Sequence, residues 1–312
     1  MARPQISRSA WLALAIVYVV WGSTYIGIEL AVRTMPPFLM ASMRFLIAGP
    51  LLYVWATRRG DRSDRPTARH WLSAFLIAAP MLAIGNAAVG WAEQTIDTGT
   101  ASLIIASVPL WMALLDRVFY AQRLARTMVI GLVVGFGGVG LLVAPGGSGA
   151  GDSRAILLVF SSLAWALGSL YSRQAPQPQR PLVAAAMQMT AGGLILAVVS
   201  AVSGEASGFH VSQVSLESWL GLAYLVAAGS LIAYTAYMWL LREVPTSLVG
   251  TYAYVNPVVA VMLGTVVLGE PLTWRTLVGG GVILASVALI VSAPKPRGAA
   301  ERRRAAVAAR AR

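Results

Sequence analysis

The chain contains no cysteine, and this absence excludes several kinds of chemistry. A disulfide framework, a covalently attached haem and a thiol nucleophile all require that residue. Histidine is nearly as scarce, with His70 and His210 far apart in predicted loops. The sequence also lacks the H-E-x-x-H, Walker A and G-x-S-x-G motifs. We therefore expect no catalytic residues, no metal site and no cofactor, and the chain does not read as an enzyme.

Charged residues are also few, and acidic residues are the fewest of all. Only 12% of the 312 residues are charged and 57% are hydrophobic, with a mean hydropathy of +0.70. A soluble domain usually has about 25% charged residues. The composition therefore predicts an integral membrane protein.

Long apolar runs account for most of the chain. A helix that spans the hydrocarbon core needs about 20 mostly apolar residues. Ten runs meet this requirement: 11–31, 38–57, 71–91, 97–116, 127–145, 155–172, 182–203, 217–241, 247–268 and 274–293. The predicted fold class is an all-α integral membrane protein with ten transmembrane helices.

The basic residues predict how this chain is oriented. With residues 1–10 in the cytoplasm and alternating spans, 20 of the 24 Arg and Lys residues are cytoplasmic, three are external and Arg44 lies inside a span. Such an excess is the positive-inside signal. We expect a multi-pass protein of the bacterial inner membrane with both termini cytoplasmic. The basic tail 294–312 has no aromatic residue for base stacking, so we expect a cytoplasmic anchor near lipid headgroups and no nucleic-acid partner.

The two halves of the chain are similar to each other. At an offset of 148, Pro257 corresponds to Pro109 and Trp239 to Trp91, whereas at 144 Trp165 corresponds to Trp21 and Gly193 to Gly49. These matches predict two five-helix repeats, 11–145 and 154–293. Because five is odd, the second repeat must enter the membrane inverted. Inverted repeats are typical of secondary transporters, whose substrate site lies near the midplane between the halves.

Polar and aromatic residues at mid-depth are candidates for a substrate cavity, because lipid cannot satisfy hydrogen-bonding groups. Tyr252 and Asn256 share one helix face, and Pro257 frees a backbone carbonyl beside them. Ordinary interhelical hydrogen bonds and lipid-facing aromatic packing are the competing interpretation. The candidate cavity residues are Trp21, Tyr25, Asn86, Trp165, Gln188, Tyr234, Tyr252 and Asn256.

Three charged residues near the external ends of spans form a second candidate group. Arg44 is expected to pair with Glu29, because pairing offsets the cost of burying a charge. Glu29 or Glu93 could instead take part in proton coupling, although proton relays usually place carboxylates deeper. A proton is therefore a candidate partner beside a small-molecule substrate and the lipid bilayer, with a monomer or weak homodimer as the expected assembly.

Several segments together resemble the EamA family of the drug/metabolite transporter superfamily, and within it the YedA-like inner-membrane exporters. The resemblance spans about 11–293 and rests on WGSTYIGIELAV, PPFLMASMRFLIAG, GNAAVGWAEQ, SSLAWALGSLYSR and YAYVNPVVAVMLGTVVLGEPL. It implies a ten-helix inverted-repeat fold and the export of small metabolites. The first repeat departs from the pattern, because AQRL at 121–124 stands where the second repeat has GEPL.

The expected function is a secondary transporter that exports small metabolites, most simply amino acids or related compounds, by alternating access through a central cavity. A multidrug exporter of aromatic cations is the first alternative, although no carboxylate lies at mid-depth. A membrane scaffold or lipid-handling protein without an aqueous cavity is the second alternative.

Overall fold

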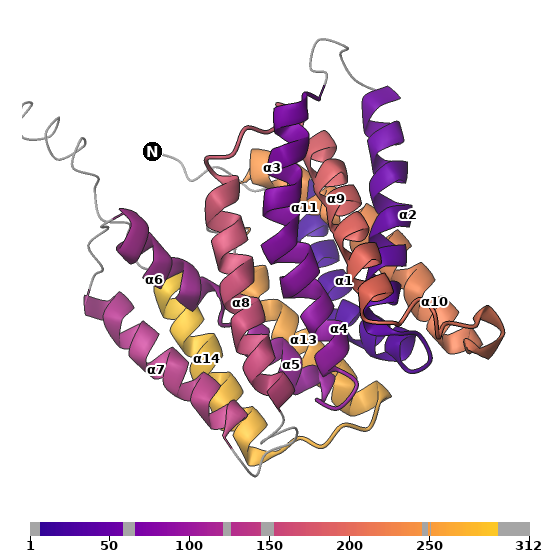
Figure 1. Ribbon diagram of the computed structural model, residues 1–312. Helices are drawn as coiled ribbons and strands as arrows, with labels where there is room; N and C mark the ends of the chain where they lie inside the picture. The colour runs from indigo at the N-terminus through magenta and orange to yellow at the C-terminus, as the bar shows by residue number, and fades with distance from the viewer. Residues whose placement is uncertain are drawn as a thin grey trace, which may run out of the picture.

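The computed structural model describes residues 7–58, 66–120, 126–144, 153–244, 249 and 251–292, and within these ranges the regular structure is entirely helical (Figure 1). The helices form one bundle. Their bounds are α1 Arg8–Val32, α2 Pro37–Arg58, α3 Ala68–Ala78, η1 Ala79–Asn86, α4 Ala87–Ala92, α5 Thr98–Ile105, α6 Val108–Tyr120, α7 Arg126–Val143, α8 Ser153–Ser172, α9 Pro181–Val202, η2 Val211–Gln213, α10 Leu216–Tyr224, η3 Leu225–Ile232, α11 Ala233–Glu243, α13 Tyr252–Val267 and α14 Trp274–Ser292.

Within the described residues, eight continuous helical stretches are long and apolar enough to cross a membrane, and two shorter apolar helices accompany them. The predicted runs coincide with these elements. The third run corresponds to α3, η1 and α4 in sequence, and the eighth to α10, η3 and α11. Part of the predicted run 247–268 lies outside the described residues, as does the AQRL segment at 121–124. The structure thus confirms that the regular structure of the described residues is all-helical, with helices of the length and composition predicted for membrane spans.

The helix ends follow from local side-chain chemistry. Ser7 caps α1, accepting a hydrogen bond from the Ala10 N–H at 3.2 Å, and Thr67 caps α3 in a reciprocal pair with His70. These caps satisfy N–H groups that have no partner within the helix. After α13 the chain turns at Gly269, whose φ of 70° favours glycine.

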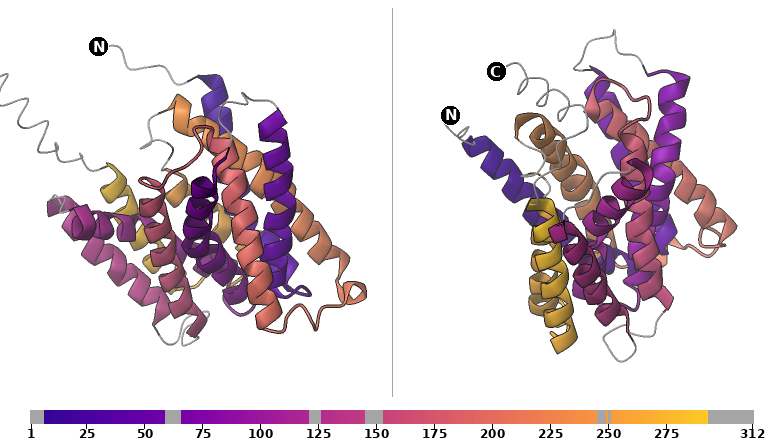
Figure 2. Two further views of the ribbon diagram at one scale, coloured as in Figure 1. Left: turned by 45° about the horizontal axis from the view of Figure 1, so that its top comes forward. Right: turned by 90° about the vertical axis from the view of Figure 1, so that its left-hand side faces the viewer.

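The helices of the two halves pack against each other in matching pairs. Helix α2 packs along α9, and α7 lies beside α14 at one edge of the bundle (Figures 1 and 2). A Cβ on Gly49 would lie 2.6 Å from Thr190, and a Cβ on Gly193 would lie 2.8 Å from Leu46. Residues 46 and 190 differ by 144, as do 49 and 193. Each contact therefore joins the same two positions, with the first half and the second half in swapped roles.

Close approach also defines the α7–α14 pair, which has little polar character. A Cβ on Gly138 would meet the Gly279 carbonyl oxygen at 3.0 Å, whereas nothing lies within 4 Å of a Cβ on Gly140. Small residues allow membrane helices to pack closely where no hydrophobic driving force acts between them. One face of α7 therefore carries the contact, and Gly140 lies on another.

We predict that Gly138→Leu lowers the stability of the protein, whereas Gly140→Leu leaves it near wild type. The leucine at 138 must displace backbone, which costs about 1–3 kcal/mol or more. The matched change at 140 meets open space on the same helix. Thermal unfolding in detergent compares the two variants, and equal melting temperatures would contradict the described packing.

Candidate functional site

Two helices carry a segment of wider, π-helical turns at corresponding places in the two halves. These segments are η1 between α3 and α4, and η3 between α10 and α11. Wide turns alter the ordinary hydrogen-bond ladder of a helix and often occur at functional sites. Backbone carbonyls freed in this way must find other partners at membrane depth.

Side chains from the opposite half meet a glycine carbonyl in each segment. Ser161 on α8 donates to the Gly85 carbonyl at 2.6 Å, and the Trp21 indole on α1 donates to the Gly229 carbonyl at 3.1 Å. A Cβ on Gly85 would lie 3.0 Å from the ring of Trp165. The pairs Trp21–Gly229 and Trp165–Gly85 are equivalent contacts with the two halves swapped. The two tryptophans differ by 144 residues, and so do the two glycines.

Trp21 and three tyrosine rings around it form an aromatic cluster. The ring centroids of Tyr237, Tyr252 and Tyr234 lie 5.0, 5.3 and 6.3 Å from that of Trp21. Tyr252 meets Trp21 edge-on, at an interplanar angle of 82°. Such geometry is favourable for aromatic rings. The structure thus brings together three of the predicted residues and adds Tyr237, which the spacing i, i+3 from Tyr234 could have indicated.

Asn256 lies one turn beyond Tyr252 and is buried. With its amide oriented so that the nitrogen faces two carbonyl oxygens, it donates to Tyr252 and to Tyr18, each at 3.2 Å. This orientation is assigned from the hydrogen bonds it makes. The amide therefore connects α13 to α1, so in this state it is occupied by protein groups.

The remaining predicted cavity residues make no ring contact with Trp21. Gln188 donates to Gln177 in the α8–α9 connection at 2.9 Å, and Asn86 directly precedes α4. Tyr25 packs against the main hydrophobic core. Trp165 lies on α8, where its ring packs against Gly85 of η1. Of these four residues, Tyr25 interacts electrostatically with Tyr252 of the Trp21 cluster.

The predicted pairing of Arg44 with Glu29 is wrong in the described structure. Arg44 is 6% exposed and donates through Nε to Ser230 at 3.1 Å, whereas Glu29 pairs with Arg33 at 3.0 Å. The physical reason is distance along the bundle: Arg33 is one helical turn from Glu29 on the same helix, and Arg44 faces η3. The wide turn of η3 supplies the hydroxyl that Arg44 uses.

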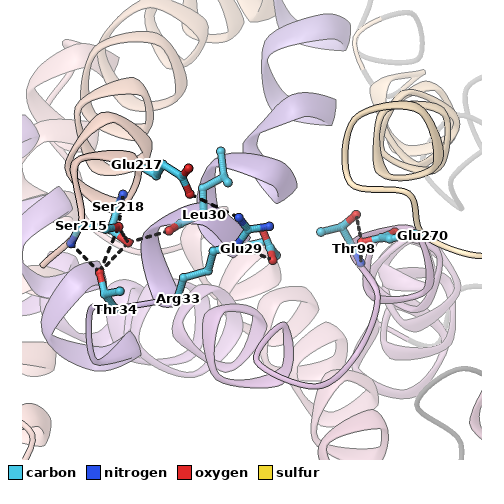
Figure 3. Close-up of polar contacts among 9 residues, drawn as sticks. All are labelled: Glu29, Leu30, Arg33, Thr34, Thr98, Ser215, Glu217, Ser218 and Glu270. Carbon is cyan, nitrogen blue, oxygen red and sulfur yellow. Dashed lines mark hydrogen bonds and ion pairs between the residues drawn. The ribbon is translucent and has the colours of Figure 1, made fainter.

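One end of the bundle, called here the carboxylate end, carries Glu29, Glu93, Glu205, Glu217 and Glu270. Figure 3 shows the polar contacts that connect α1 to α10 there. Arg33 contacts Glu29 at 3.0 Å and Glu217 at 3.4 Å. The hydrogen bond to Glu29 raises the pKa of the Arg33 guanidinium. Thr34 donates to Ser218 at 2.8 Å, and Ser218 donates to the Leu30 carbonyl at 2.8 Å.

Glu270 connects the loop after α13 to the start of α5 (Figure 3). Its carboxylate accepts from the Thr98 N–H and hydroxyl, both at 2.7 Å, and from the Gly99 N–H at 3.1 Å. A carboxylate at a helix N-terminus satisfies unpaired N–H groups and complements the helix dipole. Glu205 acts similarly toward α2 by accepting from the Leu39 N–H at 2.9 Å, and burial raises the pKa of Glu205.

Comparison with known proteins places this geometry in context. The sequence model of the EamA-like transporter family matches residues 8–144 and again 153–292. An inner membrane transporter of Escherichia coli K12, YedA, which is described as uncharacterised, is 38% identical over 279 residues, covering 89% of each chain.

More distant relatives match most of the chain. A protein of Salmonella typhimurium named a probable amino-acid metabolite efflux pump is 26% identical and covers 90% of this chain and 93% of its own. One protein of known crystal structure, 21% identical, superimposes with a TM-score of 0.61 over 90% of this chain and 96% of its own. That last similarity concerns the fold.

We predict that Arg44 is energetically coupled to Ser230 and not to Glu29. A hydrogen bond to a charged group is worth about 1.5–3 kcal/mol, and the wrong pair shares no contact. Double-mutant cycles use the changes Arg44→Met, Ser230→Ala and Glu29→Gln. Unfolding in detergent then gives the coupling energy of Arg44 with Ser230 and that of Arg44 with Glu29. A coupling energy for Arg44 and Glu29 as large as that for Arg44 and Ser230 would restore the pairing rejected above.

We predict that Glu270→Ala lowers stability by about 2 kcal/mol or more, because three hydrogen bonds to the start of α5 are lost. Glu217→Ala is the matched control at the same end, since its side chain is 67% exposed. An exposed ion pair contributes about 0–1 kcal/mol. Thermal unfolding measures both variants, and a smaller loss at 270 than at 217 would contradict the capping role.

Proposed function

Because the chain belongs to the EamA-like transporter family, we propose that it exports small metabolites, amino acids or related compounds, across the inner membrane. The family and the relatives above are transporters. The relative named an amino-acid metabolite efflux pump supports the substrate class. Transport proceeds by alternating access, with one half of the bundle moving against the other.

In this proposal the bundle is a pair of inverted five-helix repeats with ten spans and both termini in the cytoplasm. The same family model matches both halves, which supports repetition. A two-fold pseudosymmetry axis that relates the two halves is supported by two sets of reciprocal contacts. One set involves the glycines in α2 and α9, and the other involves the two tryptophans. The predicted charge distribution supports the orientation.

The observation that carries the proposal is the pair of wide helical segments, each facing a tryptophan of the other half. Transporters of this general design bind substrate where helices are interrupted near the midplane. Trp21 is the fourteenth of the 25 residues of α1, which supports a position at mid-depth. Aromatic rings, the phenols of Tyr234 and Tyr252, and the Asn256 amide suit a ligand with an apolar body and a few polar groups.

The aromatic cluster also favours one second candidate, the export of aromatic cations. Four rings around one point offer faces to a positive charge. The described contacts of the cluster include no carboxylate, so an amino acid or neutral metabolite remains our first proposal. A panel that contains both substrate classes separates the two candidates.

We predict that Trp21→Ala and Trp165→Ala lower export per folded protein by about tenfold or more, equivalent to about 1.4 kcal/mol. Trp11→Ala is the control on α1, because its side chain is 53% exposed on the bundle surface. Export is measured from proteoliposomes with radiolabelled amino acids and with an aromatic cation.

Normal export by both mid-depth variants would place the substrate site elsewhere. Absence of export of every substrate by the wild-type protein would contradict the proposed function itself. Export restricted to cations would select the second candidate.

A further inference from the structure

Glu93 is a buried carboxylate to which the proposed substrate site assigns no role. It directly follows the span Ala68–Ala92 and is 5% exposed. Among the described residues, neither of its carboxylate oxygens has a hydrogen-bond partner. An ionised carboxylate in this setting would lose its hydration without compensation, which costs several kcal/mol. The described structure therefore favours Glu93 in its neutral, protonated form.

Titratable groups that interact with Glu93 come from α1 and from the loop after α13, and the two other helices packed against α4, α8 and α2, each carry an arginine. Glu29 and Tyr25 on α1, and Glu270 in the loop after α13, interact with it electrostatically. Arg154 on α8 lies over the Trp91 ring and donates to the Trp91 carbonyl at 3.4 Å and to Thr95 at 3.3 Å. On α2, Arg44 donates to Ser230. Burial, reinforced by Glu270 and Glu29, raises the pKa of Glu93 well above its ordinary range.

Both neighbouring carboxylates hold the carboxylate end together. Glu29 anchors Arg33, which reaches α10, and Glu270 caps α5. A charge on Glu93 would repel both of them and would also require water. Ionisation at this one position therefore acts against two connections between the halves, α1 to α10 and the α13 loop to α5.

We propose that Glu93 is a proton-binding site that controls the opening of the carboxylate end. With a proton bound, Glu93 is buried and this end is closed. When the end opens, water reaches the carboxyl group, the proton passes to that water, and the remaining carboxylate opposes closure. The inference rests on the proposed function only for the assumption that the bundle alternates between closed and open states.

Thiol labelling tests this proposal without any substrate, because the chain has no cysteine of its own. Ser102→Cys places a thiol at a fully buried position one turn inside α5, where Ser102 donates to the Gly99 carbonyl at 2.7 Å. Ser207→Cys places one in the exposed α9–α10 connection. The ratio of the two labelling rates removes the pH dependence of thiol reactivity itself.

The expected result is a labelling ratio that rises with pH in the otherwise wild-type protein and stays low at every pH with Glu93→Gln. Glutamine is the neutral counterpart of the protonated carboxyl, so this variant favours the closed end. Glu243→Gln, which changes an exposed carboxylate at the end of α11, should keep the wild-type pH dependence. A ratio independent of pH in wild type, or an unchanged dependence with Glu93→Gln, would overturn the proposal.

Thermal unfolding in detergent gives a second measurement. Since folding raises the pKa of Glu93, its contribution to stability is complete below the ordinary carboxyl pKa and is lost as pH rises toward the folded value. The wild-type melting temperature should therefore fall with rising pH more than that of Glu93→Gln. Failure of Glu93→Gln to fold would also overturn the proposal, because the neutral form is the one assigned to the closed structure.

These outcomes are separate from those for the proposed function. If the wild-type protein exports substrate but shows no pH-dependent labelling, the proposed function is supported and the proton-site proposal is wrong. If the protein exports none of the substrates but its carboxylate end opens as pH rises, the proton-site proposal is supported and the proposed function is wrong.

Discussion

The structure depends on one constraint: at membrane depth every backbone polar group must find its partner within the protein. Regular helices satisfy this requirement by themselves, so most of the chain needs no further explanation. The exceptions are η1 and η3, where wide turns alter the ladder. There the partners come from the opposite half, through Ser161 and the Trp21 indole. The two halves are thus joined where their helices are least regular.

The same constraint governs the buried charges. Arg44 is accommodated by the hydroxyl of Ser230 on η3, so its position depends on a wide turn in the other half of the chain. Glu270 and Glu205 are accommodated by free N–H groups at the starts of α5 and α2. Glu93 has no such partner among the described residues. A carboxyl group left in that condition favours the neutral form, and this makes it sensitive to pH.

The fold class followed from composition and from the length of the apolar runs, because the hydrocarbon core selects helices of a fixed length. The internal offset of 144 relates Trp21 to Trp165 and Gly49 to Gly193, and each of these residues contacts the other half, although the repeat itself stays a prediction. Three residues of the aromatic cluster were also identified. The role of the candidate residues in transport stays a prediction, and so do the ten spans and their orientation.

The sequence by itself determined where apolar segments lie and which residues are expensive to bury, since both depend on side-chain chemistry along one chain. Only the tertiary structure decided which partner each buried group obtains. Arg44 binds Ser230 and not Glu29, Gln188 binds Gln177, and Glu270 caps a helix 172 residues away in sequence. The physical reason is that hydrogen bonds act over about 3 Å, and such distances between helices are set by packing, which no local sequence pattern records.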